Sequence, residues 1–446
     1  MFAIFGASLR ASVVPLLGAP HSDAEFRATA SDVISRILGL AVASLALLVA
    51  LSPLIGNALT YGLPAEARWT AVASLIVLAP AAFCQIYAAA LSATLTAARR
   101  FVFSSLLYVL AGLVALGCSA ALIALIGVVG AALGLLVGAL LLAAGHTFYL
   151  SEFGIRPGFR LALLRERAER ELALLLIAGA ALAIAFQANL AISLAAISED
   201  PGAITAYTYA FFLISLFLSM SGSSLALVTL PDLVSRVATA GAAAARDHLR
   251  TVAPYMFAVL APLLVGFGAF GQPVLEGVFS DSLSHRTVDL LYDIGLLLGA
   301  MAIPAALLFI TTPVTLALGR SKRFLSVGLA SVLVHAAIVI PASGLGPRAV
   351  ACGQLASTIV MTAVLMAATF GRPWLRLAFG GLAASLPAFA LASVFVLLRL
   401  PLSDPGLVEA LAFGALSMLI YAALVVMLWP RVGTAFVDLA RRPLGA

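Results

Sequence analysis

The sequence predicts an all-α protein, a polytopic integral membrane bundle of about thirteen transmembrane helices. Apolar residues make up 63% of the 446 residues and charged residues only 10%, against roughly 45–50% and 25% in a soluble domain. The apolar residues also form runs long enough to cross a bilayer as helices, which satisfy their own backbone hydrogen bonds. Soluble enzymes, nucleic-acid-binding proteins and disordered scaffolds are therefore excluded.

Charged residues and Gly or Pro breaks divide the chain into these apolar runs. Each run has about 19–30 residues, enough to cross a hydrocarbon core once. The expected spans are 1–19, 35–58, 70–96, 101–125, 127–150, 172–197, 204–230, 252–278, 289–318, 324–343, 349–370, 377–398 and 408–429. The pair 101–125 and 127–150 is separated only at Ile126-Gly127.

Two stretches between spans are amphipathic, His21–Arg36 and Arg160–Glu171. They fit helices that lie at the membrane interface, or loop helices that pack between spans. Prolines inside spans free backbone groups and allow bending. They are Pro80, Pro262, Pro304 and Pro313.

The basic residues predict the orientation of the chain. Of 24 Arg and one Lys (Lys322), 20 lie in one alternating set of loops and 4 in the other, while Arg10 lies within the first expected span. Cytoplasmic loops collect Lys and Arg, so the C-terminus is expected in the cytoplasm. An odd number of spans then places Met1 outside. We therefore expect that a helix upstream of Met1 is missing from this chain.

The loops carry none of the patterns of a reaction centre. No Ser/His/Asp set, no group of His or Cys ligands and no phosphate-binding Gly loop lies in an aqueous segment of the sequence. Cys84, Cys118 and Cys352 lie in apolar runs and are interpreted as core residues. We expect no catalytic residue, metal or cofactor. Many helices joined by short loops indicate a transporter, not an enzyme.

Uncharged polar side chains within the spans are candidates for lining a substrate cavity. They are Gln85, Tyr87, Gln187, Asn189, Tyr207, Tyr209 and Ser215. Such residues either line a polar cavity for sugar hydroxyls or join helices by hydrogen bonds.

Ionisable residues within the spans are costly and therefore informative. Arg10 either faces an anionic substrate such as a phosphate or extends toward the interface from a helix end. His335 either relays protons or stays uncharged and forms hydrogen bonds between helices. Asp293 is a candidate for ion coupling, or lies in an aqueous outer vestibule.

Three stretches resemble the MurJ/MviN lipid II flippases of the multidrug/oligosaccharidyl-lipid/polysaccharide exporter superfamily. The first runs from Gly6-Ala7-Ser8 to Val13-Val14-Pro15, and the second is Ala88–Leu95 followed by Arg99-Arg100-Phe101. The third begins at Ala206-Tyr207-Thr208-Tyr209-Ala210 and ends at Leu230-Pro231-Asp232-Leu233.

The resemblance implies two pseudo-symmetric helical lobes around a central cavity. The N-terminal lobe would be 1–150, without the first helix of the family, and 151–171 a cytoplasmic amphipathic linker. The C-terminal lobe would be 172–370, and two additional transmembrane helices would occupy 377–429.

The resemblance also implies a function. The protein would move a polyprenyl-linked glycan precursor of the cell wall across the bacterial cytoplasmic membrane by alternating access, as a step in peptidoglycan biosynthesis or polysaccharide export. The expected partners are this lipid-linked substrate, membrane lipids and enzymes of cell-envelope biosynthesis.

The sequence departs from the family at charged positions. Phe211 and Phe212 stand where the family has an Asp-Arg pair, and Ser215 aligns with an acidic residue. Two alternatives therefore stay open. One is an ion-coupled small-molecule exporter of the same superfamily, and the other is a membrane scaffold that transports nothing.

Overall fold

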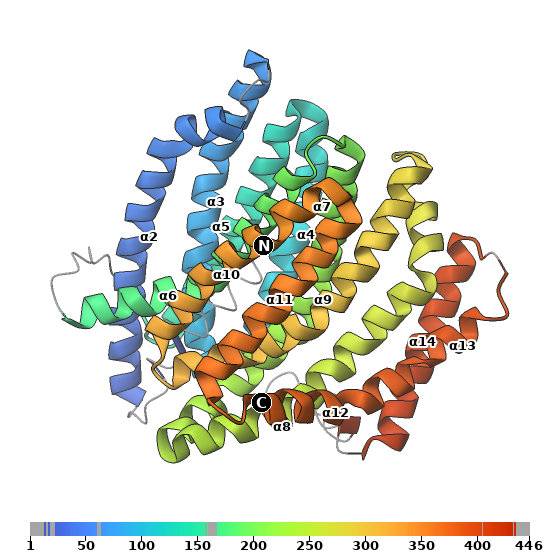
Figure 1. Ribbon diagram of the computed structural model, residues 1–446. Helices are drawn as coiled ribbons and strands as arrows, with labels where there is room; N and C mark the ends of the chain where they lie inside the picture. The colour runs from blue at the N-terminus through green and yellow to red at the C-terminus, as the bar shows by residue number, and fades with distance from the viewer. Residues whose placement is uncertain are drawn as a thin grey trace. The chain divides into compact units, whose positions relative to one another are not determined.

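The computed structural model describes residues 13, 14, 17, 23–59, 64–156, 158, 167–403, 405–430 and 432–433. These residues form helices and connecting turns with no strand among them, which confirms the predicted all-α class (Figure 1). Within this described part of the chain, twelve helices are long and apolar enough to cross a membrane. The expected span 1–19 lies almost wholly outside the described residues, so the number thirteen stays a prediction.

The contacts divide the chain into two units between Ile177 and Ala178, here called the N-terminal and the C-terminal unit. Helix α6 (Arg167–Ala196) contains this boundary. The helices of the N-terminal unit before it are α2 (Asp23–Leu59), α3 (Ala65–Ala97), α4 (Phe101–Ile126) and α5 (Val128–Glu152).

The C-terminal unit contains the rest of the described helices. They are α7 (Pro201–Leu218), the π-helix η1 (Ser219–Ser223), α8 (Ser224–Phe279), α9 (His285–Ala317), α10 (Ser321–Ala342), the 3₁₀ turn η2 (Ser343–Leu345), α11 (Pro347–Phe370), α12 (Trp374–Ala392), α13 (Val394–Arg399) and α14 (Leu407–Leu428). Helix α9 is its most enclosed element, and its side chains from Ala305 to Leu316 are buried.

Several helix boundaries differ from the expected ones. Helix α2 begins at Asp23 and so continues the amphipathic stretch directly into the span. The expected span 204–230 is divided by η1, and 377–398 is divided at Ser393. Local changes of helix type such as η1 are not visible in hydropathy, which averages over whole turns.

Helix α8 bends at Gly241. A straight helix of its 56 residues would be about 84 Å long, far more than the roughly 30 Å of a hydrocarbon core. Gly241 has a φ of 53° and a ψ of −131°, a conformation that only glycine adopts readily. The Arg236 guanidinium forms a salt bridge with Asp247 across the bend.

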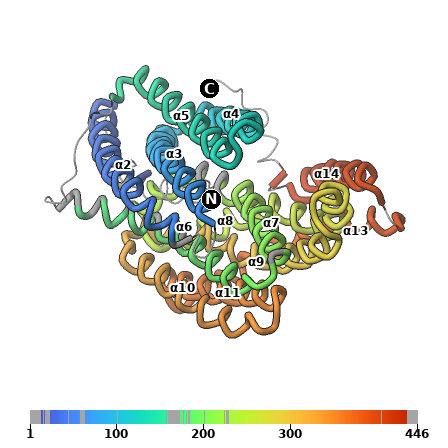
Figure 2. The backbone as a smooth tube through the Cα atoms, turned by 90° about the horizontal axis from the view of Figure 1, so that it is seen from above, coloured from blue at the N-terminus to red at the C-terminus, as the bar shows by residue number. Residues whose placement is uncertain are grey.

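A glycine seam joins α4 and α5 in the N-terminal unit. These helices lie side by side (Figure 2). Gly130, Gly134 and Gly138 recur every four residues of α5, and a Cβ at Gly138 would lie 2.7 Å from the Ala111 carbonyl oxygen. Small residues at this spacing allow two helix backbones to approach closely, so the seam sets the distance between α4 and α5.

The two units contain the same helix-ending turn. Between α3 and α4 the Arg100 amide donates to the Leu95 carbonyl at 2.8 Å, and between α9 and α10 the Arg320 amide donates to Thr315 at 3.1 Å. The residue before each arginine has positive φ, 60° at Arg99 and 70° at Gly319. This six-residue bond with a left-handed residue is a Schellman cap, so α3 and α9 end in the same way.

Candidate functional site

A buried polar cluster lies in the C-terminal unit around His335 of α10. Its Nε2 atom is 3.1 Å from Ser193 Oγ of α6, and its Nδ1 atom is 2.8 Å from Ser357 Oγ of α11. Ser193 Oγ also donates to Gln354 Oε1 at 3.3 Å. Both ring nitrogens of a buried histidine are thus held by hydroxyl groups, so the cluster links α6, α10 and α11.

Three polar atoms at this cluster are buried and unpaired. Among the residues that the structure describes, Asn189 Oδ1, the Tyr207 hydroxyl and Gln354 Nε2 have no hydrogen-bond partner. The Tyr207 hydroxyl lies beside Ser193, and the Asn189 backbone lies beside His335. We call Asn189, Ser193, Tyr207, His335, Gln354 and Ser357 the His335 cluster.

The other candidates of the C-terminal unit lie outside this cluster. Gln187 is half-buried. Tyr209 is 43% exposed, and its ring stacks on Phe279 with the centroids 5.5 Å apart. Ser215 is buried, and its carbonyl accepts a hydrogen bond from Ser219 Oγ at 2.7 Å. The structure therefore groups Asn189, Tyr207 and His335 and leaves these three residues apart from them.

Asp293 forms an ion pair on α9. The Nε atom of Arg348, at the start of α11, donates to Asp293 Oδ2 at 2.9 Å, and both side chains are partly exposed. A carboxylate that is already paired with an arginine is less available to a transported cation. The ion pair instead joins one end of α11 to α9.

In the N-terminal unit the candidates Gln85 and Tyr87 both lie on α3. Gln85 is half-buried, whereas Tyr87 is buried beside Thr147 and stacks on Phe83 with the ring centroids 6.4 Å apart. Arg10 lies outside the described residues, so its role stays a prediction.

A second buried histidine, His146 of α5, was missed by the sequence interpretation. Its Nε2 atom is 2.9 Å from Ser104 Oγ of α4, and that hydroxyl is 2.7 Å from Ser92 Oγ of α3. The His146 Nδ1 atom is 2.8 Å from the Leu142 carbonyl oxygen. This chain of hydrogen bonds joins α3, α4 and α5, as the hydrogen bonds of His335, Ser193 and Ser357 join α6, α10 and α11 in the other unit.

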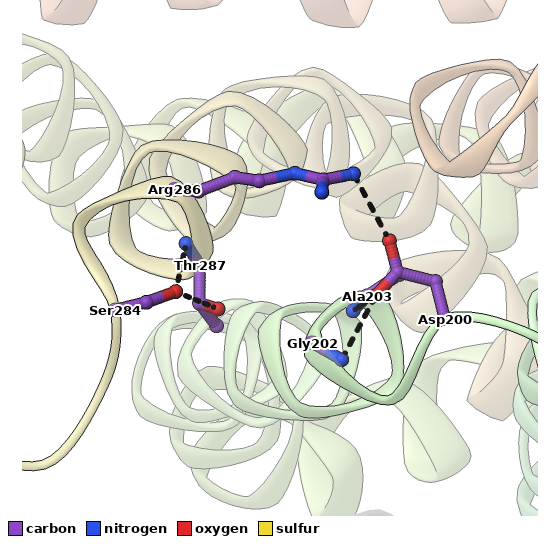
Figure 3. A network of polar contacts seen from close by, with 6 residues as sticks. All are labelled: Asp200, Gly202, Ala203, Ser284, Arg286 and Thr287. Atoms are coloured by element: carbon purple, nitrogen blue, oxygen red, sulfur yellow. Dashed lines mark hydrogen bonds and ion pairs between the residues drawn. The ribbon is translucent and has the colours of Figure 1, made fainter.

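Figure 3 shows a third polar network, where α7 and α9 begin. One oxygen of Asp200 accepts from the backbone amides of Gly202 and Ala203 at 3.0 and 3.1 Å, and the other accepts from Arg286 at 3.4 Å. Ser284 caps α9 by accepting from the Thr287 amide. Side-chain caps of this kind satisfy amides that a helix leaves free at its start.

A spacing signal in the sequence could have found the missed residues of the His335 cluster. Asn189 and Ser193 are four residues apart, as are Gln354 and Thr358, so each pair shares a helix face. Polar pairs on one face of an apolar span are typical of contacts between helices. Nothing in the sequence shows which faces meet, because Ser193 and His335 are 142 residues apart.

The polar side chains of the described residues mostly make contacts between or within helices. No group of three or more His, Cys, Asp or Glu side chains that could hold a metal ion occurs among the described residues. His335 lies between two serine hydroxyl groups, and His146 lies between a serine hydroxyl and a backbone carbonyl. The Asp293–Arg348 ion pair is partly exposed. Twelve helices of membrane-spanning length and apolarity in the described part of the chain define a polytopic membrane protein.

The comparisons identify the family more closely. The chain belongs to the family described as lipid II flippase MurJ, whose model matches residues 1–398. The resemblance drawn from the sequence motifs is thereby confirmed, and the protein is a multi-pass membrane protein of a transporter family. No curated protein matches the chain significantly.

Solved transporter structures share the fold. A lipid II flippase MurJ in an inward closed conformation has a TM-score of 0.64 at 15% identity, covering 99% of this chain and 90% of that one. The eukaryotic MATE transporter AtDTX14 has a TM-score of 0.63 at 15% identity, covering 87% of each chain. A MATE transporter in complex with MaL6 has a TM-score of 0.60 at 15% identity, covering 85% of this chain and 86% of that one.

Proposed function

We propose that this protein is a flippase that moves a lipid-linked glycan precursor of the lipid II type across the bacterial cytoplasmic membrane by alternating access. The family match over residues 1–398 carries the proposal. Its physical task is to cover a polar headgroup during the crossing, because unpaired polar groups are costly in hydrocarbon. This task requires no covalent chemistry.

The residues proposed to meet the headgroup are those predicted to line the cavity. Gln85, Gln187 and Tyr209 keep part of their side chains exposed within their units, so they can offer hydrogen bonds to sugar hydroxyls. Arg10 is the proposed contact for a phosphate, since guanidinium binds phosphate oxygens well. Phe211 and Phe212 of α7 leave the positions of the family's Asp-Arg pair uncharged.

The proposal includes orientation and partners. The charge bias of the loops supports a cytoplasmic C-terminus. The lipid-linked substrate and surrounding membrane lipids are the direct partners, and enzymes of cell-envelope biosynthesis would supply and consume the substrate.

The test is complementation of a bacterial strain depleted of its essential lipid II flippase. We expect growth to be rescued and lipid II to appear in the outer leaflet of the cytoplasmic membrane. A second version carries an added upstream helix with basic residues. Failure of both versions, at membrane levels equal to those of a rescuing flippase, would contradict the lipid II assignment.

The second candidate function is ion-coupled export of small molecules, which the likeness to MATE structures favours. Its coupling residues would be Asp293 and His335. The Arg348 ion pair counts against Asp293. Loss of drug efflux in Asp293→Asn, with Arg348→Gln as a control that breaks the same ion pair, would support this alternative.

Failure of both transport assays would leave the scaffold hypothesis. Its signature is recovery of cell-envelope enzymes with the purified protein, while reconstituted vesicles show no lipid translocation.

A further inference from the structure

We infer that the His335 cluster holds a bound water molecule, which links Asn189, Tyr207 and Gln354 inside the C-terminal unit. The inference concerns the core of one unit and does not depend on which substrate is moved. It gives Asn189 and Tyr207 a role inside the unit, although their sequence pattern suggested a place in the cavity wall.

The first argument is the number of unpaired atoms. The side chains of Tyr207 and Gln354 are 0% exposed and that of Asn189 is 5% exposed. A buried polar group without a partner costs more free energy than an ordinary hydrogen bond contributes. Three such groups in one cluster would remove much of the small net stability of a domain.

The second argument is chemical complementarity. Asn189 Oδ1 accepts a hydrogen bond, Gln354 Nε2 donates one, and the Tyr207 hydroxyl can do either. Water both donates and accepts, and a buried water molecule typically makes about three hydrogen bonds to groups of this kind. One water molecule therefore matches the whole unpaired set.

The third argument is the position of the groups. Ser193 Oγ contacts both His335 and Gln354, and the Tyr207 hydroxyl lies beside it. Asn189 precedes Ser193 by four residues, so the two side chains lie on one face of α6, about one turn apart. Two of the unpaired groups thus lie at Ser193, and the third is on the same face of α6.

The composition of the cluster favours a neutral occupant. Its six side chains include no carboxylate, and a buried cation without an anionic partner is costly. Gln354 Nε2 presents hydrogens, which repel a cation and attract the oxygen of water.

The experiment is X-ray radiolytic labelling in ¹⁸O-water, in which bound water converts nearby side chains to oxidised products. Tyr421 is the matched internal control, because it is buried and its hydroxyl donates to the Ala258 carbonyl at 2.8 Å. We expect Tyr207 to be labelled several-fold faster than Tyr421. The Asn189→Leu variant should slow labelling of Tyr207 to the rate of Tyr421.

A stability measurement gives a second, independent readout. If water is bound, Tyr207→Phe removes one of its partners and lowers the apparent Tm. If the cluster is dry, the same change removes an unpaired hydroxyl and leaves Tm unchanged or raised. Equal labelling of Tyr207 and Tyr421, or an unchanged Tm in Tyr207→Phe, would overturn the inference.

The ionic composition of the buffer separates water from a bound cation. Labelling and Tm of the wild-type protein are compared in sodium, potassium and choline chloride at equal ionic strength. Bound water predicts the same values in all three salts. A Tm that rises only with sodium or potassium would assign the site to that cation and overturn the proposal.

Discussion

The Tyr421 hydroxyl of α14 donates a 2.8 Å hydrogen bond to the carbonyl oxygen of Ala258 in α8. Ala258 precedes Pro262 by four residues, so its carbonyl is the one that loses its helical partner, because proline has no N–H group. The bond therefore replaces the hydrogen bond that Pro262 cannot donate, and it attaches α14 to α8.

Removing this hydroxyl should destabilise the protein. In Tyr421→Phe the Ala258 carbonyl stays buried without a partner, at a cost of about 1–3 kcal/mol. Thermal unfolding in detergent measures the change. Tyr209→Phe is the control, because Tyr209 is 43% exposed and its ring contact with Phe279 does not need the hydroxyl; it should have little effect.

A double-mutant cycle tests the cause. Pro262→Ala restores an N–H group that can bond to the Ala258 carbonyl within α8. In that background Tyr421→Phe should cost clearly less than in the wild type. An equal cost in both backgrounds would show that the hydroxyl does not act by replacing the bond missing at Pro262.

The glycine seam between α4 and α5 should tolerate no added methyl group. A Cβ at Gly134 would overlap the backbone of Ser119, and overpacking of this kind costs typically about 1–3 kcal/mol. Gly117 of α4 is the matched control, since nothing lies within 4 Å of a Cβ built there. We expect Gly134→Ala to lower the unfolding temperature and Gly117→Ala to leave it unchanged or raised.

The opposite result is also informative. If Gly134→Ala is as stable as Gly117→Ala, the α4 and α5 backbones do not approach as closely as the structure has them.

The spans and the turns between them could be predicted in large part, because they depend on local sequence. Gly127 ends α4 as expected and has a φ of 63°. The bend at Gly241 was not predicted, because one glycine among alanines gives no hydropathy signal. The π-helix Ser219–Ser223, which divides the expected span 204–230, was also missed, because a local change of helix type gives no hydropathy signal.

The candidate site was predictable only in its parts. Asn189, Tyr207 and His335 stand out as polar residues in apolar runs, and the structure brings them together. Tyr209 has the same sequence signal as Tyr207, yet it is exposed. Because Tyr207 and Tyr209 are two positions apart in the sequence, their side chains point in directions about 200° apart around the helix. Which of them is buried depends on where the neighbouring helices lie, and the sequence pattern does not show this.

The cap at the start of α7 should depend on its acceptor atoms more than on its ion pair. Asp200→Ala removes the acceptor for two backbone amides and should cost about 0.5–2 kcal/mol. Arg286 is highly exposed, and an exposed ion pair contributes only about 0–1 kcal/mol, so Arg286→Ala should have a small effect.

Asp200→Asn separates the two contributions, because asparagine keeps an acceptor oxygen without the charge. In chemical or thermal unfolding, the loss of stability in Asp200→Asn should be close to that in Arg286→Ala. A loss as large as that of Asp200→Ala would mean that the charge, and not the cap, stabilises this end of α7.

The paired turns of the two units give the last prediction. Arg99 has a φ of 60° where its counterpart Gly319 has 70°, and a left-handed conformation costs a residue with a Cβ roughly 1–2 kcal/mol. Arg99→Gly should therefore stabilise the protein, and Gly319→Ala should destabilise it by a similar amount. Arg99→Ala is the control, since it removes the charged side chain but keeps the strained backbone. If Arg99→Gly and Arg99→Ala change the unfolding temperature equally, side-chain interactions of Arg99 decide the effect and the backbone argument fails.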